Sequence, residues 1–136
     1  MIAFVTSNPT KKTKSKDVPL EGTRSHAIFR AWLRMLNIKE TQVKILNVSN
    51  VVTPKNRPLL VKEFQLGKLK EGLQGCTQVI ALGPTADKAL SMLKKDHFTL
   101  PHPSPSNREL NDINYISERL LECYRYLNGR ETKKSG

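Results

Sequence analysis

The segment Val79-Ile80-Ala81-Leu82-Gly83-Pro84 decides the fold class of this chain. Its first four residues form a continuous apolar run, which is typical of a short strand buried on both faces of a sheet. Gly83 and Pro84 then turn the chain, and proline suits the first position of a helix. The segment therefore predicts a buried strand that passes directly into a helix.

The same pattern recurs along the chain. Short apolar runs predict strands over 2–5, 43–48 and 98–100, and apolar residues at helical spacing predict helices over 23–36, 60–69, 84–93 and 112–127. Strand and helix alternate four times, so we expect an α/β fold with one four-stranded parallel sheet and helices on both faces.

Two details of the helices are testable in a structure. Thr23 or Ser25 is the expected N-cap of the first helix. The positions of the last helix that we expect to be buried are Ile113, Ile116, Leu120, Tyr124 and Leu127.

Length and composition indicate one small globular domain. The chain has 136 residues, of which 38% are hydrophobic and 26% charged, so we expect a single domain over 1–128 and a basic, mobile tail over 129–136. No stretch approaches the ~18 apolar residues of a membrane helix, and the N-terminus lacks the pattern of a signal peptide. Cys76 and Cys123 match no metal or redox spacing. We expect an intracellular, cytoplasmic or nucleoid-associated monomer without metal or cofactor.

The charge indicates a polyanionic partner. Twenty-three Lys+Arg against twelve Asp+Glu give a formal net charge of +11, and neutralising phosphates releases counterions, which favours binding to DNA. Basic residues gather in three places, of which the first is here called the lysine-rich segment: Lys11, Lys12, Lys14 and Lys16; Lys55 and Arg57; and Arg130, Lys133 and Lys134. A merely solvated basic surface is the alternative interpretation.

Polar segments follow three of the four predicted strands. They are Thr6-Ser7-Asn8-Pro9, Asn47-Val48-Ser49-Asn50-Val51-Val52 and His102-Pro103-Ser104-Pro105-Ser106-Asn107. In parallel sheets, ligands bind beyond the carboxyl ends of the strands. We therefore expect the functional site to be formed by these loops.

These segments resemble the motifs of the uracil-DNA glycosylase superfamily in order and spacing. His102-Pro103-Ser104-Pro105 matches the second motif of that family, and Asn8-Pro9 matches the first motif of its mismatch-specific and single-strand-selective branches. The segments 19–25, 50–58 and 79–86 are similar to the iron–sulfur (family 4) branch, whose cluster cysteines are absent here. Thr6 stands where the first motif usually opens with glycine, and Leu20 stands where an aromatic ring would stack on the base.

The resemblance implies a DNA glycosylase that flips a base out of the helix and hydrolyses its N-glycosidic bond, as in base-excision DNA repair. Because the base leaves as an anion, a nearby hydrogen-bond donor lowers the barrier, and His102 on its proline-rich loop is the candidate. Asn8 would position the attacking water. A surface histidine and a turn-forming Asn-Pro are the structural alternatives.

Other residues are candidates for binding. Asn50 suits the Watson–Crick edge of an extruded pyrimidine, although Asn47 could serve equally, and Ser7 and Leu20 would also contact the base. The expected DNA contacts are Lys11, Lys12, Ser104, Ser106, Asn107 and Arg108, the last three filling the space that the flipped base vacates.

Three functions compete on this sequence. The first is a monofunctional glycosylase for uracil or another modified pyrimidine, since no lysine stands at a motif position to form a Schiff base. The second is a catalytically inactive DNA-binding module on the same fold, which Thr6 and Leu20 favour. The third, an unrelated nucleotide-binding protein, is disfavoured because the chain has no glycine-rich phosphate loop.

Overall fold

The computed structural model describes residues 1–9, 20 and 23–129. Within them, four strands form one sheet: β1 (Ile2–Thr6), β2 (Val43–Asn47), β3 (Gln78–Leu82) and β4 (Phe98–Leu100). The strand order is β2-β1-β3-β4, and all three pairings are parallel. The expected α/β fold with a four-stranded parallel sheet is confirmed.

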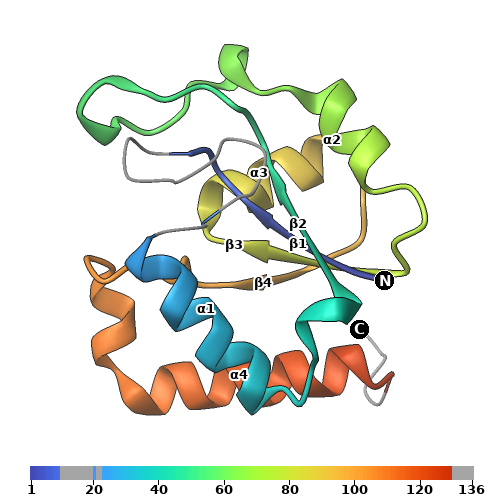
Figure 1. Ribbon diagram of the computed structural model, residues 1–136, viewed down its shortest axis with the longest axis vertical. Helices are drawn as coiled ribbons and strands as arrows, with labels where there is room; N and C mark the ends of the chain where they lie inside the picture. The colour runs from blue at the N-terminus through green and yellow to red at the C-terminus, as the bar shows by residue number, and fades with distance from the viewer. Residues whose placement is uncertain (10–19, 21–22, 130–136) are drawn as a thin grey trace.

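Helices cover both faces of this sheet, as expected. In Figure 1, α1 (Arg24–Met35) and α4 (Ile113–Leu127) lie on one side, and α2 (Leu66–Gly72) and α3 (Pro84–Met92) lie on the other. Each face has its own buried cluster, because successive side chains of a strand point to opposite faces. The cluster beneath α1 contains Phe4 and Phe29, whose rings meet edge to face at 5.0 Å between centroids.

Local sequence explains where several helices begin. Thr23 caps α1, since its hydroxyl accepts from the backbone N–H of His26 at 3.2 Å. Pro84 occupies the first turn of α3, and the carboxylate of Asp112 caps α4 by accepting from the N–H of Tyr115 at 3.0 Å.

The helix predicted over 60–69 is wrong in its first half. Val61–Glu63 forms a single 3₁₀ turn, and Phe64 then adopts an extended conformation before α2 begins at Leu66. The carboxylate of Glu63 explains the break: it accepts from the N–H of Leu60 at 2.8 Å and pairs with Arg57, which ties the turn to the preceding loop.

Two of the buried positions expected in α4 are exposed. Ile113 is 75% exposed and Tyr124 is 37% exposed, whereas Leu120 and Cys123 are buried. Ile113 lies in the first turn of the helix, and the cluster beneath α4 includes Ile116 but not Ile113. Helical periodicity identifies a face of the helix, but it does not show how far along the helix the core extends.

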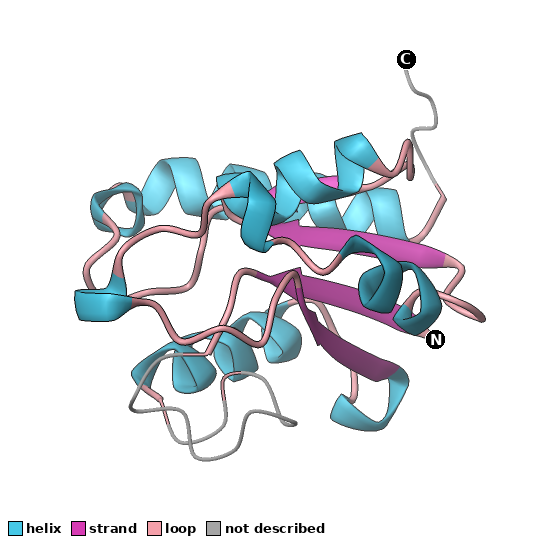
Figure 2. Cartoon of the chain, turned by 90° about the horizontal axis from the view of Figure 1, so that it is seen from above, coloured by secondary structure: helices cyan, strands magenta, loops and turns pink. Residues whose placement is uncertain are grey.

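The parallel arrangement brings the long loops to one end of the sheet. Figure 2 shows them gathered opposite the end where the N-terminus lies. These are the loops that follow the carboxyl ends of the strands, where ligands bind in such sheets. Among the described residues, no helix has the length and apolar character needed to cross a bilayer.

Candidate active site

A cavity of about 570 Å³ lies among the loops at the carboxyl ends of the strands. Its volume falls in the range of ligand pockets. Its walls come from the loops after β1, β2 and β4 and from the first turns of α1 and α3. The lining residues are Ser7, Asn8, Leu20, Thr23, Arg24, Ser25, Thr53, Arg57, Pro58, Leu59, Thr85, His102, Ser104, Pro105 and Ser106.

His102 is held on the cavity wall by its backbone. The carbonyl of His102 accepts from the N–H of Ser104 at 2.8 Å and from Nδ2 of Asn107 at 3.0 Å. Its ring reaches back to β1, where Nε2 lies 3.2 Å from Oγ1 of Thr6. Burial lowers the pKa of His102 below its usual value, so the imidazole is neutral near pH 7.

Gly83 makes room for this histidine. It ends β3 with a φ of +94° and a ψ of 174°, a conformation that is essentially restricted to glycine. A Cβ atom added to Gly83 would lie 3.0 Å from Cβ of His102. Glycine at this position therefore lets His102 pass close to the end of β3 and reach Thr6.

Asn8 is oriented by the loop that follows β2. Its Nδ2 donates one of its two hydrogens to the carbonyl of Val51 at 2.8 Å, which fixes the orientation of the amide. Among the described residues Oδ1 accepts no hydrogen bond, so it is available to a ligand in the cavity that Asn8 lines. An amide oxygen in this position can accept a hydrogen bond from a water molecule and orient its lone pairs.

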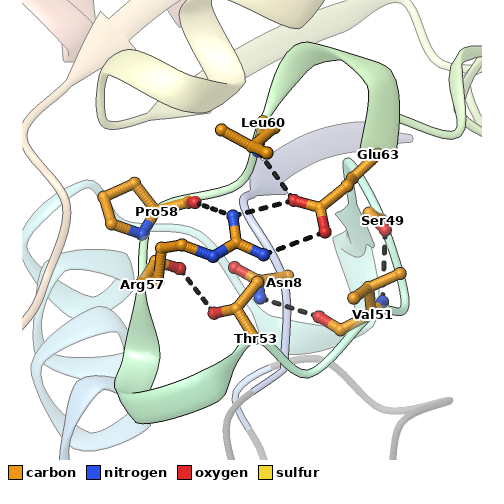
Figure 3. A network of polar contacts seen from close by, with 8 residues as sticks. All are labelled: Asn8, Ser49, Val51, Thr53, Arg57, Pro58, Leu60 and Glu63. Atoms are coloured by element: carbon orange, nitrogen blue, oxygen red, sulfur yellow. Dashed lines mark hydrogen bonds and ion pairs between the residues drawn. The ribbon is translucent and has the colours of Figure 1, made fainter.

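The loop after β2 is tied down by a network of polar contacts (Figure 3). The guanidinium of Arg57 donates to both carboxylate oxygens of Glu63 at 3.0 Å and to the carbonyl of Pro58 at 2.8 Å. Hydrogen bonds from Arg57 and from the N–H of Leu60 lower the pKa of Glu63 to about 2. Thr53 donates in turn to the carbonyl of Arg57. This network keeps Arg57 at the cavity and fixes the loop that orients Asn8.

Six of the predicted site residues line the cavity: Ser7, Asn8, Leu20, His102, Ser104 and Ser106. The expectation that Asn8 and His102 share one pocket is confirmed. Leu20 has a φ of +70°, which is unusual for a leucine. Its carbonyl accepts from both the N–H and the hydroxyl of Thr23, at 3.0 and 2.6 Å. These bonds hold the leucine in that conformation at the cavity wall.

Asn50 does not line the cavity, so the expected convergence of Asn50 with Asn8 and His102 is wrong. The N–H of Asn50 donates to Oε1 of Gln65 at 2.9 Å, and Gln65 donates its own N–H to the carbonyl of Val48. Gln65 is the N-cap of α2, which covers the face of the sheet opposite α1. The contacts with Gln65 therefore hold the backbone of Asn50 beside the start of α2.

The residues predicted to contact DNA are distributed unevenly. Ser104 and Ser106 lie at the cavity, with 2.9 Å between their hydroxyl oxygens. The amide of Asn107 is engaged at both ends, by the carbonyl of His102 and by the N–H of Glu109. Arg108 lies outside the cavity, on a separate shallow hollow. Lys11 and Lys12 lie outside the described residues, as does the rest of the lysine-rich segment.

Sequence reasoning missed several lining residues. Thr85 follows β3, so the rule that ligands bind at the carboxyl ends of strands could have identified it. Arg24 and Ser25 come from the first turn of α1, and nothing in the local sequence showed that this turn faces the cavity.

Among the described lining residues, two are arginines and none is a carboxylate. Because Arg57 is paired with Glu63, Arg24 is the charged lining residue that can favour an anionic ligand such as a nucleic acid backbone.

The described residues offer no group of three or more His, Cys, Asp or Glu side chains close enough to hold a metal ion. Both cysteines are free and buried, and burial raises the pKa of the Cys123 thiol to about 12.

The sequence matches a known protein family. Residues 1–127 match the family model described as the uracil DNA glycosylase superfamily. A search of curated proteins finds no significant match.

Proposed function

Because the chain belongs to the uracil-DNA glycosylase superfamily, we propose that it is a monofunctional DNA glycosylase that removes uracil or another modified pyrimidine. The observation that carries the proposal is that Asn8, from the loop after β1, and His102, from the loop after β4, line one cavity. One of these side chains can orient water, and the other can donate a hydrogen bond to a leaving base.

The two roles follow from the chemistry of N-glycosidic hydrolysis. The bond between C1′ and the base nitrogen breaks, and its electron pair leaves with the base. A neutral imidazole N–H of His102 stabilises the negative charge that develops on the base oxygen, without transferring its proton. The water oxygen bonds to C1′, and the proton that it loses passes through solvent to the departed base.

Asn8 supports the attack of water by position. No carboxylate lies among the described lining residues, so a strong general base is not provided by them. Since Nδ2 of Asn8 is bound to Val51, its Oδ1 can accept a hydrogen bond from the water and direct the oxygen lone pair at C1′. Such positioning is effective because sugar C1′ becomes strongly electrophilic as the base departs.

The positive charge of the chain supports DNA as the partner. The net charge of +11 favours a polyanion, and Arg24 adds a positive charge at the cavity. In this proposal the lysine-rich segment, Ser104 and Ser106 contact the backbone, and the flipped base enters between Leu20 and His102.

A panel of oligonucleotides tests the proposal. Each carries one modified base in single- or double-stranded form, and excision is detected as an alkali-labile abasic site. The proposal requires excision from at least one substrate.

A catalytically inactive DNA-binding module is the second candidate, and the position of Asn50 outside the cavity favours it, since the base edge then lacks the expected amide. Tight binding of DNA without excision of any base would establish that candidate instead.

A further inference from the structure

We propose that Thr6 is a positioning residue that sets the tautomer of His102. The hydroxyl of Thr6 donates to Nε2 of His102, so the neutral ring carries its proton on Nδ1, and Nδ1–H is the group presented to the cavity. The contribution of this group to base departure rests on the proposed function. The assignment of the tautomer does not.

The surroundings of Thr6 determine the direction of its hydrogen bond. Thr6 is the last residue of β1 and is only 1% exposed, so its hydroxyl is shielded from bulk water. Among the described residues, the only hydrogen-bond partner of Oγ1 is Nε2 of His102, at 3.2 Å. A buried hydroxyl that accepted from Nε2–H would leave its own hydrogen without an acceptor there, and such unpaired groups are strongly disfavoured.

The neighbouring residue on β2 provides no competing hydrogen bond for the hydroxyl of Thr6. Asn47 is the register partner of Thr6 across the β1–β2 pair, and residues in register lie side by side on the same face of the sheet. The buried Nδ2 of Asn47 has no hydrogen-bond partner among the described residues. Among the described residues, the Asn47 amide therefore forms no hydrogen bond with the Thr6 hydroxyl, and His102 remains its partner.

The protonation state of the His102 ring follows from its burial and from its bond to Thr6. Burial lowers the pKa of His102 and keeps the ring neutral near pH 7. A neutral imidazole has one N–H and one acceptor nitrogen. Because Nε2 accepts from Thr6, the proton stands on Nδ1, which makes no hydrogen bond to any other described residue. Nε2 is occupied by Thr6 at the end of β1, and His102 lines the cavity, so we assign Nδ1–H as the ring donor for a ligand.

Thr6 stands where the resembled motif usually has glycine, and its hydroxyl explains what threonine does at this position. A glycine has no hydroxyl to bind Nε2, so it would leave the tautomer to other contacts. Threonine at the end of β1 fixes the tautomer through its own hydroxyl. Because Gly83 has no Cβ, His102 can pass close to it and reach Thr6. The replacement of glycine by threonine thus positions the histidine and does not by itself indicate loss of activity.

Nitrogen NMR of the full chain tests the tautomer without a substrate. The protein is labelled with ¹⁵N-histidine, and the His102 signals are assigned by their loss in His102→Ala, since the chain has three histidines. We expect a protonated Nδ1 and an unprotonated Nε2 near pH 7. A protonated Nε2 in the wild type would overturn the inference.

Two variants of Thr6 separate positioning from structure. Thr6→Val keeps the shape of the side chain and removes the hydroxyl, so we expect Nε2 to gain protonation; Thr6→Ser keeps the hydroxyl and should retain the wild-type signals. If both variants give the wild-type spectrum, Thr6 does not set the tautomer. The wild-type spectrum decides the assignment even if Thr6→Val fails to fold.

Single-turnover excision links the tautomer to function. We expect Thr6→Val to slow excision about 10-fold, the order expected for loss of one hydrogen bond, with DNA affinity unchanged and the rate restored in Thr6→Ser. An Nδ1–H tautomer in a protein that excises no base leaves the inference standing and removes the proposed function. Excision by a wild type that holds Nε2–H removes the inference and leaves the proposed function.

Discussion

Replacing Gly83 by alanine is expected to lower stability and to slow base excision, through two separable effects. The first is backbone strain. Gly83 has a φ of +94° and a ψ of 174°, and holding a residue with a Cβ in such a region costs about 1–3 kcal/mol. The second is contact with the active site. The new Cβ would lie 3.0 Å from Cβ of His102, so the histidine must move by a few tenths of an ångström.

The size of the kinetic effect follows from that displacement. A misplacement of about 1 Å can slow an enzymatic step by about 10²-fold, so a shift of a few tenths should slow excision by up to about 10-fold. Urea denaturation measures the loss of stability, and single-turnover kinetics with saturating enzyme measures the chemical step.

Gly75→Ala is the matched control. Gly75 also has a positive φ, +82°, but a Cβ placed there would meet nothing within 4 Å. It should therefore lose stability through strain, about 1–2 kcal/mol, and keep the wild-type excision rate. If Gly83→Ala excises as fast as Gly75→Ala, the close approach of Gly83 to His102 does not serve catalysis.

Three further predictions concern charge and burial. The folded-state pKa of Glu63 is about 2, below its usual 4.5. The stabilisation from its pair with Arg57 is therefore complete above pH 4.5 and is lost as the pH falls towards 2. The free energy of unfolding, measured against pH, should show this decline in the wild type but not in Glu63→Gln. Alanine at all four lysines of the lysine-rich segment should flatten the plot of log DNA affinity against log salt by about 0.9 for each phosphate that the protein no longer neutralises, and an unchanged slope would remove that segment from the interface. Cys123, which is fully buried and whose pKa is raised to about 12, should react with a thiol reagent only after unfolding; rapid labelling of the native protein would contradict its burial.

The strands and most of the helices could be predicted because their signals are local. The apolar run before Gly83 and the proline after it specify both a buried strand and the start of α3, and the structure confirms both. The caps at Thr23 and Asp112 are equally local. Such features need only neighbouring residues to form, so the order of residues is enough to predict them.

Features that depend on distant contacts could not be predicted. The 3₁₀ turn before α2 exists because Glu63 pairs with Arg57 across a loop, and helical periodicity cannot reveal that pair. Gln65, fifteen positions later in the chain, binds the backbone of Asn50, and Asn50 does not line the cavity. A sequence motif indicates which loop carries a polar side chain, but the contacts of that loop decide the face on which it lies.

The candidate site itself was predictable in outline. Asn8 and His102 each follow a strand, and parallel strands bring their carboxyl ends to one edge of the sheet, so their loops meet. The orientation of each side chain was not predictable: Asn8 is turned by Val51, and the ring of His102 is turned by Thr6. Each partner lies far from the residue that it orients, 43 positions for Asn8 and Val51 and 96 for His102 and Thr6.

The most direct test of the central claim is the single-turnover excision rate of His102→Ala and Asn8→Ala on a base that the wild type removes. We expect each variant to excise about 10²–10³-fold more slowly, as after the loss of one preorganised hydrogen bond to the transition state, while DNA affinity changes little because neither residue neutralises a phosphate. Full single-turnover rates in both variants would contradict the assignment of this cavity as the active site.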